Sequence, residues 1–188
     1  MAFVVIAGVT AVCLAASEYF PRFGGEPDTT LVVERIVRAE SNGNSKAKNP
    51  RSSATGAGQI IDQTWVENIQ RHRQDLAAGR TREDLLALRG DPALSREIVA
   101  RMVEKNARML RKRGLSVTPG TLYLAHFAGS AGAVAVLTGA DDRDAASLLA
   151  AADATGRSTR EQLVKANPFL ATLTVGELKS WANRKMRG

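Results

Sequence analysis

The chain has 188 residues, of which 44% are apolar and 24% charged, with a formal net charge of +7. This composition excludes a disordered chain and a protein with several membrane spans, and the length suits one domain with a hydrophobic core. A single cysteine, Cys13, excludes a disulfide framework, and two histidines are too few for a multi-histidine metal centre. The positive charge predicts an anionic partner (nucleic acid, a membrane surface or an acidic wall polymer) or is an ordinary basic surface.

The N-terminal segment, residues 1–17, contains no charged side chain. An apolar run of this length that ends in small residues at 15–17 is typical of a secretory signal, although no lysine or arginine precedes it. We therefore predict export to the periplasm, with a membrane anchor or a buried terminal helix as the alternatives. Residues 18–28 contain several Pro and Gly residues and are predicted to be a linker.

A helix is predicted over about residues 30–41. Val33, Ile36 and Val37 have the spacing of one helix face, and Glu40 continues that face. A carboxylate on a core-facing stripe costs free energy unless it has a function. A general acid must still be protonated near neutral pH, and partial burial favours this by raising the pKa of a carboxyl group. Glu40 has the placement for this role, with a solvated helix-end glutamate as the alternative.

A long polar loop, with or without a short hairpin, is predicted over residues 42–59. Between Glu40 and Asp62 the sequence contains no carboxylate, and we interpret Asp62 as the cap of the next helix. Ordinary glycosidases use two carboxyl groups. Glu34 is on the same helix as Glu40 but on another face. The missing partner therefore favours a mechanism with one carboxylate, in which the substrate supplies its own nucleophile.

The rest of the chain is predicted to be helical, without strands or internal repeats. The expected helices are one from Ile61 to about Arg73, a short one capped by residues 81–84 that ends at Gly90, one over 92–113, one that starts at Pro119 and breaks at 129–133, Ala-rich helices over 131–137 and 144–152, one capped by Ser158 and Glu161 that stops before Asn167, and a last helix over 175–186 capped by Thr174.

The predicted helix over residues 92–113 carries a strongly basic face. Its basic side chains are Arg96, Arg101, Lys105, Arg108, Arg111, Lys112 and Arg113. This run is either a solvated face that matches the helix dipole at its C-terminal end or a contact for a polyanion. Because no aromatic residues are interleaved with it, we rank nucleic-acid binding low and predict no nucleic-acid partner.

Three segments resemble the motifs of the soluble lytic transglycosylases, which have a goose-type lysozyme fold. Residues 40–44, Glu-Ser-Asn-Gly-Asn, resemble the first motif. Residues 53–59 with the Thr-Trp pair at 64–65 resemble the second, and residues 123–129 resemble the third. In the third segment His126 and Phe127 stand where the family more often has Tyr and Asn.

The resemblance implies a mainly α fold, with a lysozyme-like catalytic domain over residues 29–135. Residues 136–188 would form a helical extension that packs on this lobe, or a separate binding module. The implied activity is cleavage of the β-1,4 bond between N-acetylmuramic acid and N-acetylglucosamine in periplasmic peptidoglycan, with a 1,6-anhydro product and no metal or cofactor. Contact with a secretion or flagellar assembly apparatus, and membrane association through the N-terminus, are left open.

The resemblance also assigns roles to individual residues. Glu40 would act first as the acid and then as the base. The substrate-binding residues would be Ser41, Thr55, Gly56, Gly58, Gln59, Tyr123 and His126, and either Tyr123 or His126 would orient Glu40. The alternative functions are a hydrolytic muramidase on the same fold and a non-catalytic basic module that binds the wall or nucleic acid.

Overall fold

The structure is a computed structural model, and it describes residues 27–156 and 158–187. Within these ranges the regular structure is helical, and strand pairing is limited to isolated bridges. The mainly α fold class is therefore confirmed. The predicted export signal and most of the predicted linker lie outside the described residues.

The helices follow the predicted order, with the addition of two short ones, α3 and η2, that were not predicted. They are α1 (Thr29–Ser41), α2 (Asp62–His72), α3 (Gln74–Ala77), α4 (Arg82–Ala87), the 3-10 helix η1 (Leu88–Gly90), α5 (Pro92–Lys112), α6 (Pro119–Thr138), α7 (Ala145–Ala152), α8 (Arg160–Ala166), the 3-10 helix η2 (Pro168–Ala171) and α9 (Val175–Lys185). The predicted break in α6 is a kink at Gly129, where φ is 70° and the helix direction changes.

Two predicted helix caps are wrong. Asp62 is the first residue of α2 rather than its cap, and its carboxylate accepts a hydrogen bond of 2.7 Å from Arg89 Nη1. The capping box of α8 lies one residue further along than predicted and pairs Thr159 with Gln162. Ser158 precedes this cap, and its N–H donates to Asp153 in the turn after α7.

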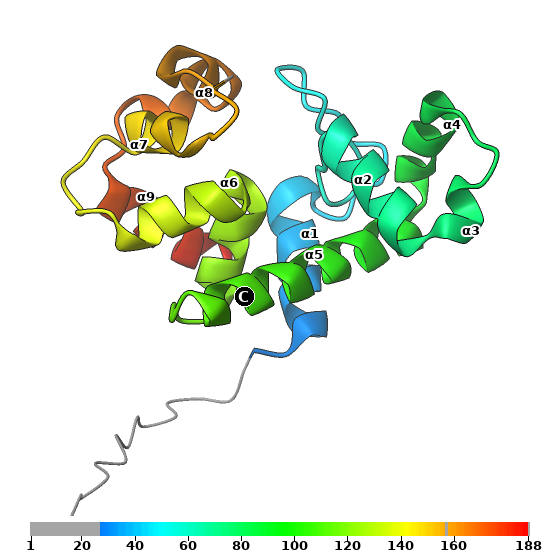
Figure 1. Cartoon of the computed structure of the whole chain (residues 1–188), viewed down its shortest axis with the longest axis horizontal. Coiled ribbons are helices and arrows are strands. Elements are labelled where there is room, and N and C mark those ends of the chain that lie inside the picture. Colours follow the sequence, from blue (N-terminus) through cyan, green and yellow to red (C-terminus); the bar gives the residue numbers. More distant parts are fainter. Residues whose placement is uncertain (1–26, 157, 188) are drawn as a thin grey trace, which may run out of the picture.

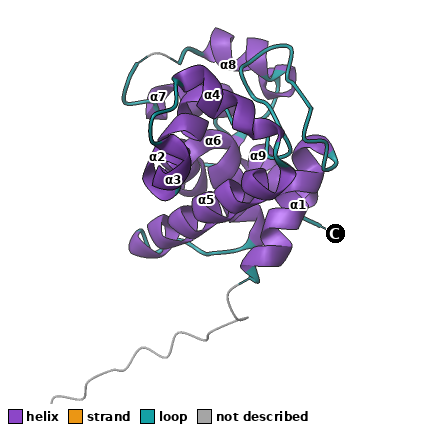
Figure 2. Cartoon of the chain, turned by 90° about the vertical axis from the view of Figure 1, so that its right-hand side faces the viewer, coloured by secondary structure: helices purple, strands orange, loops and turns teal. Residues whose placement is uncertain are grey.

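Helix α6 is at the centre of the molecule. It packs against α1, α5, α7 and α9, while α2 to α4 lie to one side of the α1–α5 pair and α7 and α8 to the other (Figure 1). Figure 2 shows α6 behind α5 and between the other helices. One buried cluster joins residues such as Ile36 and Trp65 to Leu149 and Leu178. The predicted domain boundary after residue 135 falls within α6, so the C-terminal helices share this core.

Among the described residues α6 is also the one helix that is long and apolar enough to cross a membrane, by length and composition alone. Core helices pass the same test, and α6 is surrounded by other helices.

Asp144 connects the helices of the C-terminal region. Its carboxylate accepts hydrogen bonds from Ser147 N at 2.7 Å and from Arg160 Nε at 3.0 Å, and Arg160 also donates to Ala171 O. The hydrogen bond from Arg160, followed by that from Ser147, holds the pKa of Asp144 well below its usual range. Asp144 therefore stabilises the fold above its unfolded pKa of about 3.9, and this contribution is lost as the pH falls through the lower folded pKa.

We expect Asp144→Asn to lower the free energy of unfolding at neutral pH and to weaken its dependence on pH in the acid range. Denaturant unfolding between neutral pH and pH ~3 measures both effects. Asp142→Asn is the control, because Asp142 is an exposed neighbour. An equal pH dependence in wild type and Asp144→Asn would contradict this role of Asp144.

Candidate active site

Glu40 lies in the last turn of α1 and is half-buried. The apolar residues that precede it on the same helix face, Val33, Ile36 and Val37, are at most 5% exposed. This face packs against the core, and Glu40 is therefore held at the edge of the core where α1 meets the following loop. The predicted position of Glu40 at the end of an apolar helix face is confirmed by this geometry, and its catalytic role stays a prediction.

Tyr123, in the first half of α6, lies against Glu40. Its side chain is 2% exposed. Burial raises the pKa of the Tyr123 hydroxyl far above its usual value, and the charge of Glu40 and a hydrogen bond between the two side chains raise it further. The hydroxyl is consequently protonated at neutral pH and acts as the donor to the carboxylate. Of the two residues considered for orienting Glu40, Tyr123 is the one that contacts it.

His126 instead contacts the loop. Its Nε2 lies 3.1 Å from Gly58 O, and because a carbonyl can only accept, Nε2 carries the proton in this contact. Its Nδ1 is buried and has no hydrogen-bond partner among the described residues. His126 thus connects α6 to the loop, less than one helix turn from the Tyr123–Glu40 contact.

Three helices hold the loop at residues 57 and 58. From α1, Ser41 Oγ donates to Ala57 O at 2.8 Å. From α5, Ser95 Oγ accepts from Gly58 N at 3.2 Å, and from α6 His126 donates to Gly58 O. The loop is therefore held beside Glu40 by contacts from α1, α5 and α6.

Ser95 was missed by the sequence analysis. It is 1% exposed and lies on the buried side of α5. A small polar residue within an apolar helix face was the available signal, since a buried hydroxyl needs a hydrogen-bond partner.

Three further predicted substrate-binding residues shape the loop itself. Thr55 pairs with both Lys48 and Ile60 in isolated antiparallel bridges, so the predicted hairpin option is confirmed in this short form. Gln59 has a positive φ of 48°, and its Nε2 donates to Gly56 O at 2.9 Å. The structure assigns these side chains contacts within the loop, and their contact with a substrate stays a prediction.

Arg89 supports the base of this hairpin and was also missed. Arg89 is only 9% exposed, and its buried charge has partners. Its Nη1 donates to Ser53 O at 2.9 Å and forms an ion pair with Asp62. A buried arginine of this kind cannot be recognised from the chain order, because its partners lie 36 and 27 residues away.

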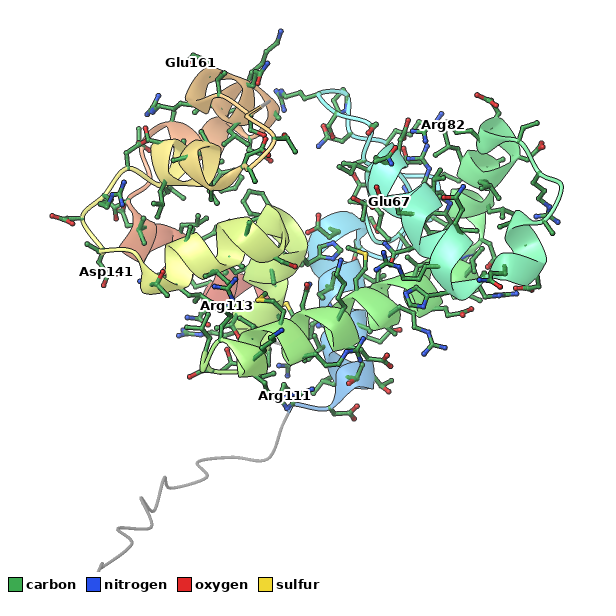
Figure 3. All side chains as sticks on the ribbon, in the orientation of Figure 1. Glu67, Arg82, Arg111, Arg113, Asp141 and Glu161 are labelled. Atoms are coloured by element: carbon green, nitrogen blue, oxygen red, sulfur yellow. The ribbon has the colours of Figure 1, made fainter. Side chains whose placement is uncertain are left out.

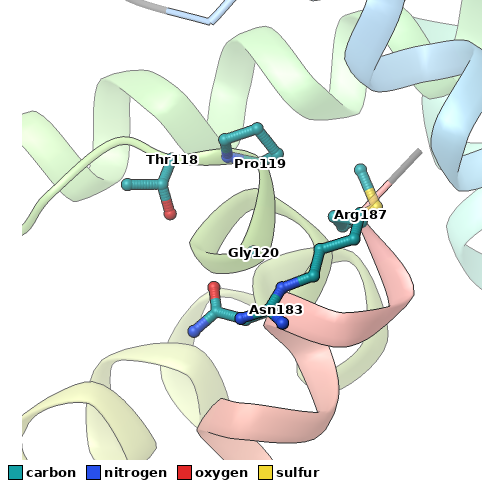
Figure 4. A pocket seen from close by; sticks show the side chains of 6 residues that line it. Thr118, Pro119, Gly120, Asn183 and Arg187 are labelled. Atoms are coloured by element: carbon teal, nitrogen blue, oxygen red, sulfur yellow. The ribbon is translucent and has the colours of Figure 1, made fainter. Parts of the chain in front are cut away.

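A cavity of about 460 Å³ lies next to the loop-binding part of α6, starting at Phe127. Its wall combines the kinked segment of α6 with α7, α8 and the turn between them, and small residues such as Ala128, Gly132 and Ala152 predominate. A second cavity of about 240 Å³ lies where the start of α6 meets the end of α9, lined by Thr118, Gly120, Asn183 and Arg187 among others (Figure 4). None of the predicted site residues lines either cavity.

Aromatic side chains connect the site to the C-terminal helices. The ring of Trp181 in α9 lies 5.3 Å from that of Tyr123 and 5.0 Å from that of Phe127. Phe169 stacks on Trp181 at 4.8 Å. Aromatic contacts at these distances stabilise beyond their buried area, so α9 supports the helix turn that presents Tyr123.

Comparison with the sequence models of known protein families gives no match for this chain, and comparison with curated proteins gives no significant match. Within the described residues, no group of three or more His, Cys, Asp or Glu side chains is placed to hold a metal ion.

The close fit of Gly58 on α5 gives a testable consequence. A Cβ at this position would lie 2.5 Å from Val99 Cγ2. We expect Gly58→Ala to destabilise the protein by about 1–3 kcal/mol through overpacking. Val99→Ala removes the clashing methyl, so the double variant should be more stable than the sum of the two single effects, which denaturant unfolding measures. Strictly additive effects would mean that the loop does not rest on Val99.

Proposed function

We propose that this protein is a peptidoglycan lytic transglycosylase of the periplasm, with a lysozyme-like fold. The observation that carries the proposal is the setting of Glu40: a half-buried carboxylate at the end of α1, in contact with the buried Tyr123 hydroxyl and beside a loop held by α1, α5 and α6. The resemblance of residues 40–44, 53–59 and 123–129 to the transglycosylase motifs agrees with this arrangement.

Glu40 supplies one group that can both give and take a proton. In the first step its carboxylic acid protonates the glycosidic oxygen between N-acetylmuramic acid and N-acetylglucosamine, and the bond from this oxygen to the muramoyl C1 breaks. The acetamido group of the muramoyl sugar stabilises the positive centre at C1. In the second step the Glu40 carboxylate takes the proton from the muramoyl 6-hydroxyl, whose oxygen bonds to C1 and closes the 1,6-anhydro ring. The same residue is thus acid and then base.

The neighbours of Glu40 position it rather than react. The Tyr123 hydroxyl stays protonated and donates to the carboxylate, which fixes its orientation. Ser41 is occupied by the loop carbonyl of Ala57, so we assign it to holding the loop instead of the sugar. His126 has the same function through Gly58. The backbone of residues 56–58, together with Gln59, is then the part of the loop that we propose lines the sugar cleft.

The proposal is tested by incubating the full chain with purified sacculi. We expect release of soluble muropeptides and a fall in turbidity. If no muropeptides are released under any condition, the enzymatic proposal is wrong. Tight binding to duplex DNA with a steep dependence on salt, in the absence of wall cleavage, would instead support the basic binding module.

Tyr123→Phe removes the hydroxyl and keeps the ring that packs on Trp181. We expect the rate of muropeptide release to fall about 10- to 100-fold, because the carboxylate loses its orienting donor. The free energy of unfolding should change by only about 1 kcal/mol, the net value of one hydrogen bond. An unchanged rate, measured by the same release assay, would show that Tyr123 does not orient Glu40.

A further inference from the structure

The loop between α1 and α2 carries three basic side chains that the proposed cleavage does not use. They are Lys46, Lys48 and Arg51, named here the loop cations, and all three are exposed. No carboxylate occurs within residues 41–61, so the loop cations are the only charged side chains of this segment. Figure 1 shows the loop extending from the end of α1 away from α5.

The positive charge of the loop is not neutralised from within the chain. None of the loop cations forms an ion pair with a carboxylate of residues 27–156 and 158–187. The two carboxylates that border the loop in the sequence have other partners, since Asp62 pairs with Arg89 and Glu40 contacts Tyr123. The loop cations are therefore available to an anion from outside the chain.

Two of the loop cations adjoin the residues that we propose line the sugar cleft. The carbonyl oxygen of Ala47 accepts hydrogen bonds from Gly56 N at 2.9 Å and from Gln59 Nε2 at 3.2 Å. Lys46 and Lys48 are the chain neighbours of Ala47, with Cα atoms about 3.8 Å from its own. The hydrogen bonds of Ala47 thus hold both lysines next to the cleft-lining part of the loop.

Lys48 is also paired directly with Thr55, one of the predicted substrate-binding residues. The two residues form an isolated antiparallel bridge. Directly opposed residues of an antiparallel pair have their side chains on the same face, with Cβ atoms about 4.5–5.5 Å apart. Ser41, the residue after Glu40, binds Ala57 O in the same loop at 2.8 Å. A charge at Lys48 therefore belongs to the structure that is fixed beside Glu40.

We propose that the loop cations bind carboxylates of the peptide stem of peptidoglycan, so that the enzyme prefers peptide-bearing glycan strands to strands without peptides. The stem is attached to the lactyl group of N-acetylmuramic acid and contains free carboxylates. When the muramoyl sugar is bound beside Glu40, its stem is tethered close to the loop and has a high effective concentration there. This inference rests on the proposed function, because that function is what places the sugar at Glu40.

Two other anionic partners are distinguished from the peptide stem. A nucleic acid fits the loop less well, because residues 41–61 contain no aromatic side chain on which a base could stack. A general attraction of the wall polymer to every basic surface of the protein would involve α5 as much as the loop. The second alternative is therefore separated from the proposal by substitutions in α5.

The test compares kcat/KM of the full chain for purified peptide-bearing glycan strands and for the same strands after an amidase has removed the peptides. We expect the wild-type chain to prefer the peptide-bearing strands by about 3- to 10-fold, the effect of one or two exposed ion pairs. Lys46→Glu with Lys48→Glu should abolish this preference by raising KM for the peptide-bearing strands. Amidation of the stem carboxylates should abolish the wild-type preference, and higher ionic strength should weaken it.

Lys105→Glu with Lys112→Glu is the matched control. It changes the net charge by the same amount through two exposed lysines of α5. Figure 3 shows Arg111 and Arg113, the chain neighbours of Lys112, at the lower edge of the molecule, on the opposite side from the loop in this view. We expect this variant to keep the wild-type preference, and denaturant unfolding checks that both double variants keep the fold.

Three results would overturn the inference. An unchanged preference in the Lys46/Lys48 variant would remove the loop from stem recognition, and an equal loss in both double variants would mean that only the overall charge matters. Equal cleavage of both kinds of strand by the wild-type chain would also overturn it, while the proposed function would stand. Cleavage of neither kind would contradict the proposed function itself, and the inference with it.

Discussion

Replacement of Glu40 by glutamine is expected to reduce the release of muropeptides from sacculi by about 10²- to 10⁴-fold, the usual contribution of a general acid–base group. Glutamine keeps the size and hydrogen-bonding capacity of the side chain, but it cannot give a proton to the glycosidic oxygen or take one from the 6-hydroxyl. Because Glu40 is half-buried at the edge of the core, the fold should be retained. The initial rate of muropeptide release measures the effect.

Glu34→Gln is the matched control for this substitution. Glu34 belongs to the same helix, is 46% exposed and pairs with Arg96 on the surface. It should therefore have near wild-type activity and lose no more than the small contribution of a surface ion pair. Equal activity of Glu40→Gln and Glu34→Gln would remove Glu40 from the mechanism.

The second large effect is expected from Gly56→Ala, which should destabilise the protein by about 2–4 kcal/mol. Gly56 has a φ of 81°, a conformation that alanine adopts only with strain. A Cβ there would also lie 2.6 Å from the backbone oxygen of Arg89, and a backbone atom cannot move aside as a side chain can. Chemical denaturation measures the loss, and activity should fall with it because Gly56 belongs to the loop beside Glu40.

Gly43→Ala separates the two causes. Gly43 has the same φ of 81°, but nothing lies within 4 Å of a Cβ built on it. This variant should show only the conformational strain, about 1–2 kcal/mol. If Gly43→Ala and Gly56→Ala destabilise equally, the close approach of Arg89 to the loop does not contribute.

Several features of the site could be predicted because they depend on neighbours in the chain. The stripe of Val33, Ile36 and Val37 places Glu40 at the core edge through helix periodicity alone, and the residues show the expected burial. The bounds of α5 and α9 likewise follow from local caps, Asp91 and Thr174. The mainly α fold class rests on the same local signals.

The remaining features depend on contacts between distant residues. Asp62 pairs with Arg89 and does not cap α2, and no pattern within α2 indicates this pairing. Ser95 contacts the N–H of Gly58 and His126 contacts its carbonyl, and both contacts form only when α5 and α6 pack against the loop. The choice between Tyr123 and His126 was undecided for the same reason: the two residues differ in position by less than one helix turn, and packing alone determines which contacts Glu40.

The central claim, ring closure by the muramoyl 6-hydroxyl under the control of Glu40, is tested most directly by mass spectrometry of the muropeptides released from purified sacculi. We predict 1,6-anhydromuropeptides from the wild-type chain and almost none from Glu40→Gln. Products with only reducing ends would contradict the claim and identify water as the nucleophile, as in a hydrolytic muramidase.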